Sequence, residues 1–565
     1  MQETYAENFL AKILGVGASF TTIFVLASGT TDPVNTTKLV ALGATGTACL
    51  AVLLGSGIIR RTLQSRVTVW AVITFSIFML VVSILSTSTL SQNLWGVYGR
   101  NNGLVSYTFL GMVLLGGLTL RLNSSFESVV RGFVFAGLVN LVYLVWVNLF
   151  GDPIGWNNTY GNILGTLGNP NFIGAFLGMF LASYISFVLA YQSSKLLRIS
   201  LLIVPALTVF EIIKSHAIQG RVVGAFGIAI LGFYLIRSKY GAGSQLAYSA
   251  FCSVFGVFAL LGALQKGPFS EFIYKTSVSL RGQYWLAGWE MGKNHLWTGV
   301  GMDAVGDWYR RTRSPHALEL PGVNVVVNAS HNVPIDIFAY GGIPLISAYL
   351  LLVGLTLLAI LKVTLRTKSF NPIFTCLVII WSGYQLQSII SINQIGLAVW
   401  GWLSSGALIA YERTSRIPNK GDSGGIAKSK DRKMNSDIQS KLVLLSFAGT
   451  IIGATVSAPP LIADSKWRDA NNKRSVQLLE GSFKPSFFNP QNSYKYMVSI
   501  QDLEASGLFD LAHKYALQAT AWNSESFELW KVLYLLKAST SSEKSLALEN
   551  MKRLDPLNPD VTAIQ

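Results

Sequence analysis

Charged residues are scarce in this sequence. Aspartate, glutamate, lysine and arginine make up 13% of the 565 residues, whereas hydrophobic residues make up 51% and the mean hydropathy is +0.44. Soluble domains carry about 25% charged residues, and half that share cannot cover the surface of several water-soluble domains. A purely soluble protein is therefore excluded.

Cysteine is also rare, with three copies in the chain. Cys49, Cys252 and Cys376 each lie inside an apolar run, so they predict neither a disulfide framework nor the ligand spacing of a metal site. We interpret all three as packing residues.

Apolar runs of about 20 residues recur along most of the chain, each long enough to cross roughly 30 Å of hydrocarbon. The sequence therefore predicts an all-α, polytopic membrane helix bundle of about 12–13 transmembrane helices. The first run lacks a clear small-residue cleavage site, which favours a retained span over a removed signal peptide. The predicted spans are residues 9–29, 39–58, 67–87, 104–120, 132–150, 171–192, 199–218, 222–236, 245–264, 343–361, 372–392, 395–411 and 440–458.

Basic residues follow every second span up to the tenth, and such residues are retained in the cytoplasm. The bacterial plasma (inner) membrane is the expected location, with two large segments facing outward. The chain then divides into a membrane domain at 1–411 that includes an extracytoplasmic loop at 265–342, a basic cytoplasmic linker at 412–439, a final transmembrane helix at 440–458 and an extracytoplasmic tail at 459–565. The basic linker reads as a solvated segment and needs no nucleic-acid partner.

The tail is polar and charge-balanced, with twelve basic and twelve acidic residues. Residues 501–521, 526–538 and 542–554 have the pattern of short amphipathic helices and resemble a degenerate tetratricopeptide array. Because such a repeat needs neighbours to bury its apolar face, we expect the tail to dock, either on the membrane domain or on a protein partner.

Three of the five histidines lie in the predicted loop 265–342. A lone loop histidine is by default a solvated polar residue. His331 differs in its context, because the segment from Asn328 to Asn332 leads into Gly341 and Gly342 and then into the tenth predicted span. Imidazole titrates near neutrality, which makes His331 the candidate base.

Arg100, Arg221 and Arg281 lie in predicted outward segments, where arginine is less common. A single outward arginine is explained by snorkelling or by lipid headgroups, and the tryptophans that follow Arg281 suit a helix in the membrane interface. Two outward arginines and a histidine at one membrane surface would instead form an anion-binding site with a general base. We predict Arg221, Arg281 and His331 as the catalytic group and Arg100 as a substrate-binding residue.

The segment from Gly165 to Asn171 is too polar and broken for a lipid-facing helix, so it is buried in protein or lines a wet space. A simple turn with a helix cap explains it equally well. Asn169, Asn171 and Asn332 are the candidate substrate-binding asparagines. The sequence has no Walker A loop, and the outward segments contain no ligand spacing suited to a catalytic metal. We therefore expect no metal and no cofactor, and phosphate chemistry would depend on arginine.

In their order along the chain, these segments resemble the bacterial O-antigen ligase and O-antigen polymerase superfamily, which includes protein O-oligosaccharyltransferases. The resemblance covers about residues 1–411. The family pattern of a histidine, then asparagine, serine or glutamine, nine further residues and a glycine is matched by His331, Asn332 and Gly342, whereas Leu345 departs from its end. The other matching segments are Gly96–Gly103, Gly165–Asn171, Gly220-Arg221, Arg281 and Asn294–Gly301.

The resemblance implies a metal-independent, inverting membrane glycosyltransferase that moves a glycan from undecaprenyl diphosphate to an acceptor hydroxyl. Arg221 and Arg281 would hold the diphosphate leaving group, and His331 would take the proton from the acceptor. The expected partners are a lipid-linked glycan donor, membrane lipids, and an acceptor that is a glycan, a lipid or a protein. Ligase and polymerase both remain open.

Two other classes of function compete with an enzyme. A transporter or exporter of polar glycans or solutes usually shows ionisable residues or broken helices near the midplane, often in paired repeats. Here no internal repeat is evident, and the ionisable candidates cluster toward the predicted outer ends of spans. A signalling or assembly protein would need far fewer spans as an anchor. The sequence therefore favours the enzyme.

Overall fold

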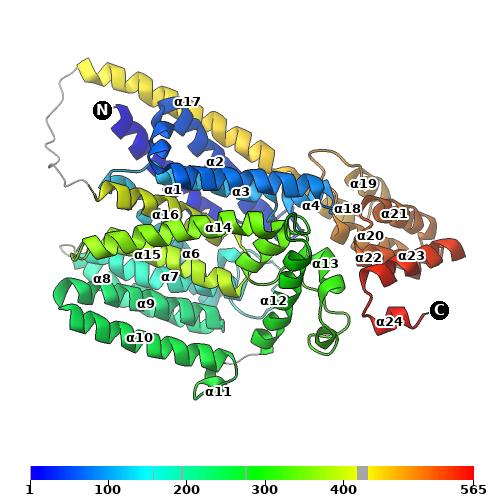
Figure 1. The fold of residues 1–565 in the computed structure, drawn as a ribbon. Coiled ribbons are helices and arrows are strands. Elements are labelled where there is room, and N and C mark those ends of the chain that lie inside the picture. The colour runs from blue at the N-terminus through cyan, green and yellow to red at the C-terminus, as the bar shows by residue number, and fades with distance from the viewer. Residues whose placement is uncertain (1, 157, 192–194, 274–275, 417–429, 565) are drawn as a thin grey trace.

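The computed structural model describes residues 2–156, 158–191, 195–273, 276–416 and 430–564. Within those ranges the chain consists of helices joined by turns and loops and has no β-strand. One isolated β-bridge joins Ser486 and Asn489. Figure 1 shows long helices lying side by side, with a group of shorter helices from the tail at one end. The predicted all-α class is confirmed.

Ten helices in the described part of the chain are long and apolar enough to cross a membrane, which supports a multi-pass membrane protein. Each overlaps one of the predicted spans. They are α2 (Asn35–Ser56), α3 (Arg66–Leu85) together with the preceding 3-10 helix η1 (Ile58–Ser65), α6 (Asn123–Phe150), α7 (Pro170–Leu189), α8 (Lys195–Lys214), α9 (Ile218–Lys239), α10 (Ala242–Ala263), α14 (Val333–Arg366), α15 (Pro372–Ile390) and α17 (Lys430–Ser457).

The remaining three predicted spans also fold as helices, namely α1 (Gln2–Ile23), α5 (Leu104–Leu118) and α16 (Ile395–Thr414). They fall outside the ten because α5 has 15 residues and the other two are more polar. α16 is buried along nearly its whole length and packs on α5. A helix covered by other helices tolerates the small and polar residues that lipid would penalise. The larger count of spans stays a prediction.

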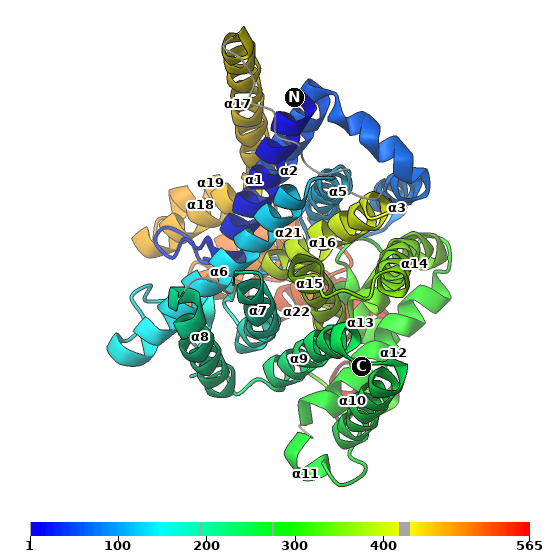
Figure 2. The ribbon, with the colours of Figure 1, turned by 90° about the vertical axis from the view of Figure 1, so that its left-hand side faces the viewer.

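Two helices lie at the rim of the bundle. Figure 2, which views the bundle nearly end-on, shows α10 and α17 at its outer edge. Only 6% of the apolar stretch of α10 is buried inside the protein. A broad apolar face left uncovered in this way suits contact with lipid.

Basic turns collect at one end of the bundle. Arg61 in η1 pairs with Glu7 of α1 at 2.5 Å, and Arg413 near the end of α16 donates to the carbonyl of Arg61 at 3.4 Å. Arg366 at the end of α14 pairs with Glu412 at 2.8 Å. These basic turns share one side of the bundle, as their regular alternation along the chain predicts.

The tail forms a second core of its own. The predicted helix 501–521 is divided at Gly507, whose φ is 77°. Trp530, Leu533 and Leu536 are buried in this core, which the helical spacing explains without any chemistry. The tail helices are α18 (Pro459–Lys473), α19 (Val476–Ser482), α20 (Ser493–Ala505), α21 (Phe509–Trp522), α22 (Phe527–Leu535), α23 (Ser541–Leu554) and α24 (Pro559–Thr562).

The tail docks on α13 (Val305–Thr312), a short helix within the long loop between α10 and α14. Asp555 accepts hydrogen bonds from Arg313 at 2.7 Å and from Arg310 at 2.9 Å, and the carboxylate and the Arg313 side chain are fully buried. Two further acidic residues of the tail, Glu525 and Glu528, pair with arginines of the same helix. The tail therefore docks on another part of the same chain, the long loop that contains α13.

Replacing Asp555 with alanine is expected to destabilise the protein by about 3–5 kcal/mol, because the change leaves the buried Arg313 guanidinium without a carboxylate and removes one of the two carboxylates that pair with Arg310. Thermal unfolding in detergent, combined with limited proteolysis of the tail, would measure the loss. Asp560→Ala removes an exposed carboxylate from the same stretch and should leave the melting temperature unchanged. Equal shifts in the two variants would contradict the docking role of Asp555.

Candidate functional site

The loop between α4 (Leu90–Trp95) and α5 is tightly folded and carries Arg100. Gly96 has a φ of 82°, and a Cβ at this position would lie 2.4 Å from a backbone nitrogen of the same loop, so glycine is required there. The loop is also held from outside, because Asp303 Oδ2 accepts a hydrogen bond from the Val97 N–H at 2.7 Å. Arg100 is thereby presented by a fixed backbone.

Glycines also fix the long loop against α14. Residues 295–301 follow α12 (Thr276–Asn294) and lie against a break in α14 at Gly341 and Gly342. Gly342 has a φ of 63°, and a Cβ there would lie 2.1 Å from the carbonyl oxygen of Leu296. Three backbone hydrogen bonds, of 2.9, 3.2 and 2.7 Å, join the two segments. The break separates a short first part of α14 from its longer remainder.

His331 lies immediately before that short first part. Its φ is 56°, a left-handed conformation that is uncommon for a residue with a side chain. On one side, the backbone N–H of Ser330 donates to Asp336 at 2.6 Å. On the other, Asn332 caps α14 by accepting from the Ile335 N–H at 3.1 Å. The backbone on both sides of His331 is therefore fixed.

Two arginines affect the protonation of the His331 ring. Burial, followed by the positive charges of Arg100 and Arg281, lowers the pKa of His331 from its ordinary value to about 3. Arg281, on α12, is half-buried, and burial lowers its pKa while the nearby phenol of Tyr284 opposes this. The Tyr284 and His331 ring centroids lie 5.6 Å apart. Arg100, Arg281 and His331 form the candidate site, with a neutral imidazole at physiological pH.

One guanidinium nitrogen in this site has no hydrogen-bond partner among the described residues. Arg100 Nη1 is buried, and in the described part of the chain nothing hydrogen-bonds to it. Arg100 and Asp303 interact electrostatically: the carboxyl of Asp303 is fully buried, burial raises its pKa, and the charge of Arg100 opposes that rise. A buried donor without a partner costs free energy, and an anionic ligand would satisfy it.

Two acidic residues that hold the site were not predicted from the sequence. Asp303 joins the Arg100 loop to α14, since its second oxygen accepts from the Tyr340 hydroxyl at 3.0 Å. Asp336 holds the backbone beside His331. Their positions in the sequence could have identified them. Asp303 follows the glycine-rich block that ends at Gly301, and Asp336 interrupts the apolar start of α14.

The structure leaves other predicted site residues outside this group. Arg221, near the start of α9, has an exposed side chain and is not among the charges that lower the pKa of His331. Asn169 caps α7 by accepting from the Asn171 N–H at 2.8 Å and donates to the Tyr160 hydroxyl at 3.0 Å. The amide oxygens of Asn169 and Asn332 are thus committed to helix caps, which accounts for them without a substrate.

The segment that contains Asn169 is buried in protein. Its 3-10 helix η2 (Gly165–Leu167) lies between α1 and α6, and the Thr166 hydroxyl donates to the carbonyl of Thr22 at 3.0 Å. The side chain of Asn140 accepts from the Thr166 backbone at 3.0 Å. Of the explanations for this broken segment, burial with a turn and a cap is the one observed.

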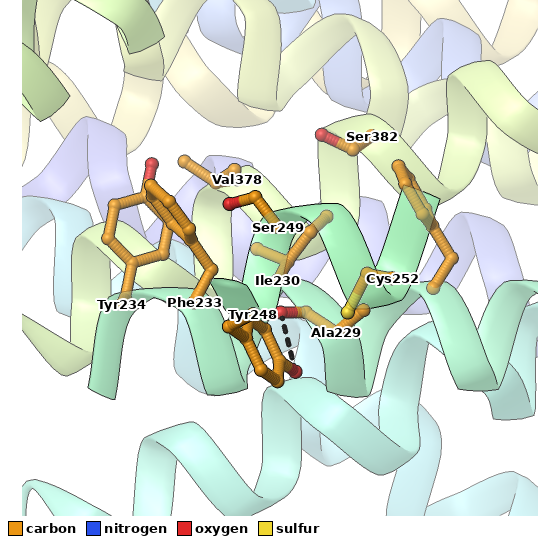
Figure 3. Close-up of a pocket in the computed structure, with 10 residues that line it drawn as sticks. Ala229, Ile230, Phe233, Tyr234, Tyr248, Ser249, Cys252, Val378 and Ser382 are labelled. Carbon is orange, nitrogen blue, oxygen red and sulfur yellow. Dashed lines mark hydrogen bonds between the residues drawn. The ribbon is translucent and has the colours of Figure 1, made fainter. Parts of the chain in front are cut away.

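A separate cavity of about 320 Å³ lies between α9, α10 and α15. Figure 3 shows that its lining is mostly apolar, with the Tyr248 hydroxyl directed to the carbonyl of Ala229. That hydrogen bond measures 3.2 Å. None of the candidate site residues lines the cavity.

Comparison with known proteins adds no assignment to this geometry. The sequence matches no protein-family model. It also matches no curated protein. Among the described residues, no three histidine, cysteine, aspartate or glutamate side chains are grouped so as to hold a metal ion.

Proposed function

We propose that this chain is a membrane glycan transferase, related to the O-antigen ligases and polymerases, that moves a glycan from a polyprenyl diphosphate of the undecaprenyl class to an acceptor hydroxyl. The observation that carries the proposal is the placement of two guanidinium groups, one with a buried unpaired nitrogen, beside one neutral imidazole. Guanidinium groups match phosphate oxygens, and a neutral imidazole can accept a proton.

The reaction assigns a role to each of the three side chains. The acceptor oxygen attacks the anomeric carbon while the bond from that carbon to the diphosphate oxygen breaks, and the electron pair leaves with the diphosphate. Arg100 and Arg281 stabilise the negative charge that develops on the leaving group. His331 receives the acceptor proton. Attack from the face opposite the leaving group inverts the anomeric configuration.

The proposed orientation places the end of the bundle with the basic turns in the cytoplasm and the end with His331 outside. Nucleotide sugars are absent outside the plasma membrane, so a lipid carrier must bring the glycan. The tail shares the outer side, because it docks on α13 in the loop that also contributes Asp303.

Cysteine labelling in spheroplasts is expected to distinguish the two ends. A cysteine in place of Glu319, which is exposed in the long loop, should react with an impermeant thiol reagent, whereas a cysteine in place of exposed Leu63 in η1 should stay unlabelled until the cells are lysed. The native cysteines provide the background measurement in the unsubstituted protein. Labelling of position 63 alone in intact spheroplasts would reverse the proposed orientation.

The proposed activity is tested with purified protein in liposomes that carry a polyprenyl-diphosphate-linked oligosaccharide. Glycan transfer should release the polyprenyl diphosphate and leave the sugar on the acceptor. A transporter would instead move the intact glycan or its carrier across the bilayer with no bond broken. Intact donor with changed sidedness would therefore contradict the proposal and support the transporter.

Deletion of the gene in its native host would separate ligase from polymerase. Loss of a polymerase leaves single unpolymerised repeats, whereas loss of a ligase leaves full-length chains on the lipid carrier. Glycan profiling of lipids, polysaccharide and proteins would also identify the acceptor, because the glycosylated form of that acceptor disappears.

A further inference from the structure

A tight turn in the tail presents two phenylalanine side chains. In this turn, between α19 and α20, the Asn489 N–H donates to the carbonyl of Ser486 at 3.0 Å, so Phe487 and Phe488 occupy its tip. The two residues are 55% and 43% exposed. Large apolar side chains at a tip of this kind would ordinarily be removed from water.

The turn is rigidly built. Asn489 is buried, and its side-chain amide donates to the backbone carbonyls of Gly481, Ser482 and Lys484, at 3.4, 2.9 and 2.7 Å. The amide of Asn489 thus ties both arms of the turn together and fixes the backbone that carries the two phenylalanines. The exposed position of the two phenylalanines therefore belongs to a turn with a defined hydrogen-bonded structure.

The tip rests on α4, at the end of a candidate span. The Phe487 and Trp95 ring centroids lie 5.8 Å apart, and the Ser91 hydroxyl donates to the carbonyl of Gln491 at 2.9 Å. α3 ends a few residues before α4, and its exposed apolar residues recur at helical spacing along one face: Trp70, Ile73, Ile77, Leu80, Ile84 and, beyond it at the start of α4, Leu90. Uncovered apolar surface thus runs along α3 to the start of α4, the helix on which the tip rests.

The base of the tail is held at the same rim. α18 begins two residues after the end of α17, another candidate span. Asp464 of α18 accepts hydrogen bonds from the backbone of Thr31 at 2.6 Å and of Asp32 at 3.0 Å, in the connection between α1 and α2. The tail cannot move far from the ends of these spans without breaking these bonds.

We infer that the Phe487–Phe488 tip inserts into the lipid leaflet at the end of α3, so that a membrane lipid surface is the partner that covers it. Lipid is the occupant because the tip continues the apolar surface that α3 already turns outward. Phenylalanine in the headgroup region with a nearby lysine, here Lys484, is the pattern of an interfacial anchor. The anchor would hold the tail against the bilayer whatever reaction the chain performs.

Spin-label accessibility in the full-length protein tests this contact. The protein, with Cys252 replaced by alanine, is placed in nanodiscs of phosphatidylethanolamine and phosphatidylglycerol, and a nitroxide is attached at Phe488→Cys. Molecular oxygen concentrates in hydrocarbon, whereas a nickel chelate stays in water. The ratio of oxygen to nickel accessibility at position 488 should be severalfold above that at the control Leu535→Cys, a residue of α22 that is 65% exposed.

A second lipid reference and a second tip label complete the test. Leu85→Cys, at the exposed end of α3, reports the value for the lipid interface, and Phe487→Cys repeats the measurement should a label at 488 disturb the turn. Tip values that match position 85 support the inference. Tip values that match position 535 overturn it, as does protection from both reagents, which would mean that protein or glycan covers the tip.

Discussion

Replacing Arg281 with alanine is expected to lower kcat/KM for the proposed glycan transfer by about 10²–10³-fold, because the reaction would lose a preorganised cation at the leaving group. Arg281 is half-buried, where its charge acts more strongly than it would in water. Arg281→Lys keeps the charge but loses the planar fork, so we expect an intermediate loss. The measurement is the initial rate of transfer from the lipid-linked donor at several donor concentrations.

Lys293 provides the matched control. It lies on the same helix, α12, but is exposed and pairs with Glu290 at 3.3 Å. Lys293→Ala therefore removes one positive charge without touching the site, and its activity should stay close to that of the unsubstituted protein. If Lys293→Ala and Arg281→Ala lose the same activity, the effect is one of overall charge and the leaving-group role is wrong.

Substitution of Arg221 distinguishes the site implied by the family resemblance from the site observed in the structure. The family resemblance makes Arg221 a second diphosphate ligand, whereas the structure places its exposed side chain outside the group formed by Arg100, Arg281 and His331. Arg100→Ala tests the geometry directly, because Arg100 Nη1 is buried and has no hydrogen-bond partner in the described part of the chain. A larger loss of kcat/KM in Arg100→Ala than in Arg221→Ala would support the geometric site.

Replacing His331 with alanine is expected to lower kcat by about 10²–10⁴-fold, the usual contribution of a positioned general base. His316 is the control, since it lies in the same loop with an exposed side chain that pairs with Glu319. His316→Ala should leave the rate unchanged. Full activity in His331→Ala would remove the assignment of this imidazole as the base.

The dependence of kcat/KM on pH gives a second measure of His331. Because its pKa in the free protein is lowered to about 3, the imidazole is already neutral at pH 5, and kcat/KM should not fall from protonation of this residue between pH 8 and pH 5. An exposed histidine with the ordinary pKa of about 6.5 would instead lose activity about tenfold per pH unit below that value. A decline with a midpoint near the ordinary value would contradict the buried environment.

The spans and the tail helices were predictable because they depend on local sequence. An apolar run of sufficient length is itself the signal for a membrane helix, and each predicted span overlaps a helix. The packing role of Trp530, Leu533 and Leu536 likewise follows from helical spacing. The break in α14 was visible as Gly341-Gly342, although its partner, the carbonyl of Leu296, was not.

The sequence by itself determined the membrane class of the protein, the helices, and seven candidate residues for the site, among them Arg100, Arg221, Arg281 and His331. Only the tertiary structure decided which candidates meet, since it joins Arg100, Arg281 and His331 and leaves Arg221 outside. It also showed that Asp303 holds the Arg100 loop through a hydrogen bond from the Val97 N–H. The physical reason is that apolar length and helical periodicity are properties of neighbouring residues, whereas the burial of a charge depends on contacts between distant segments.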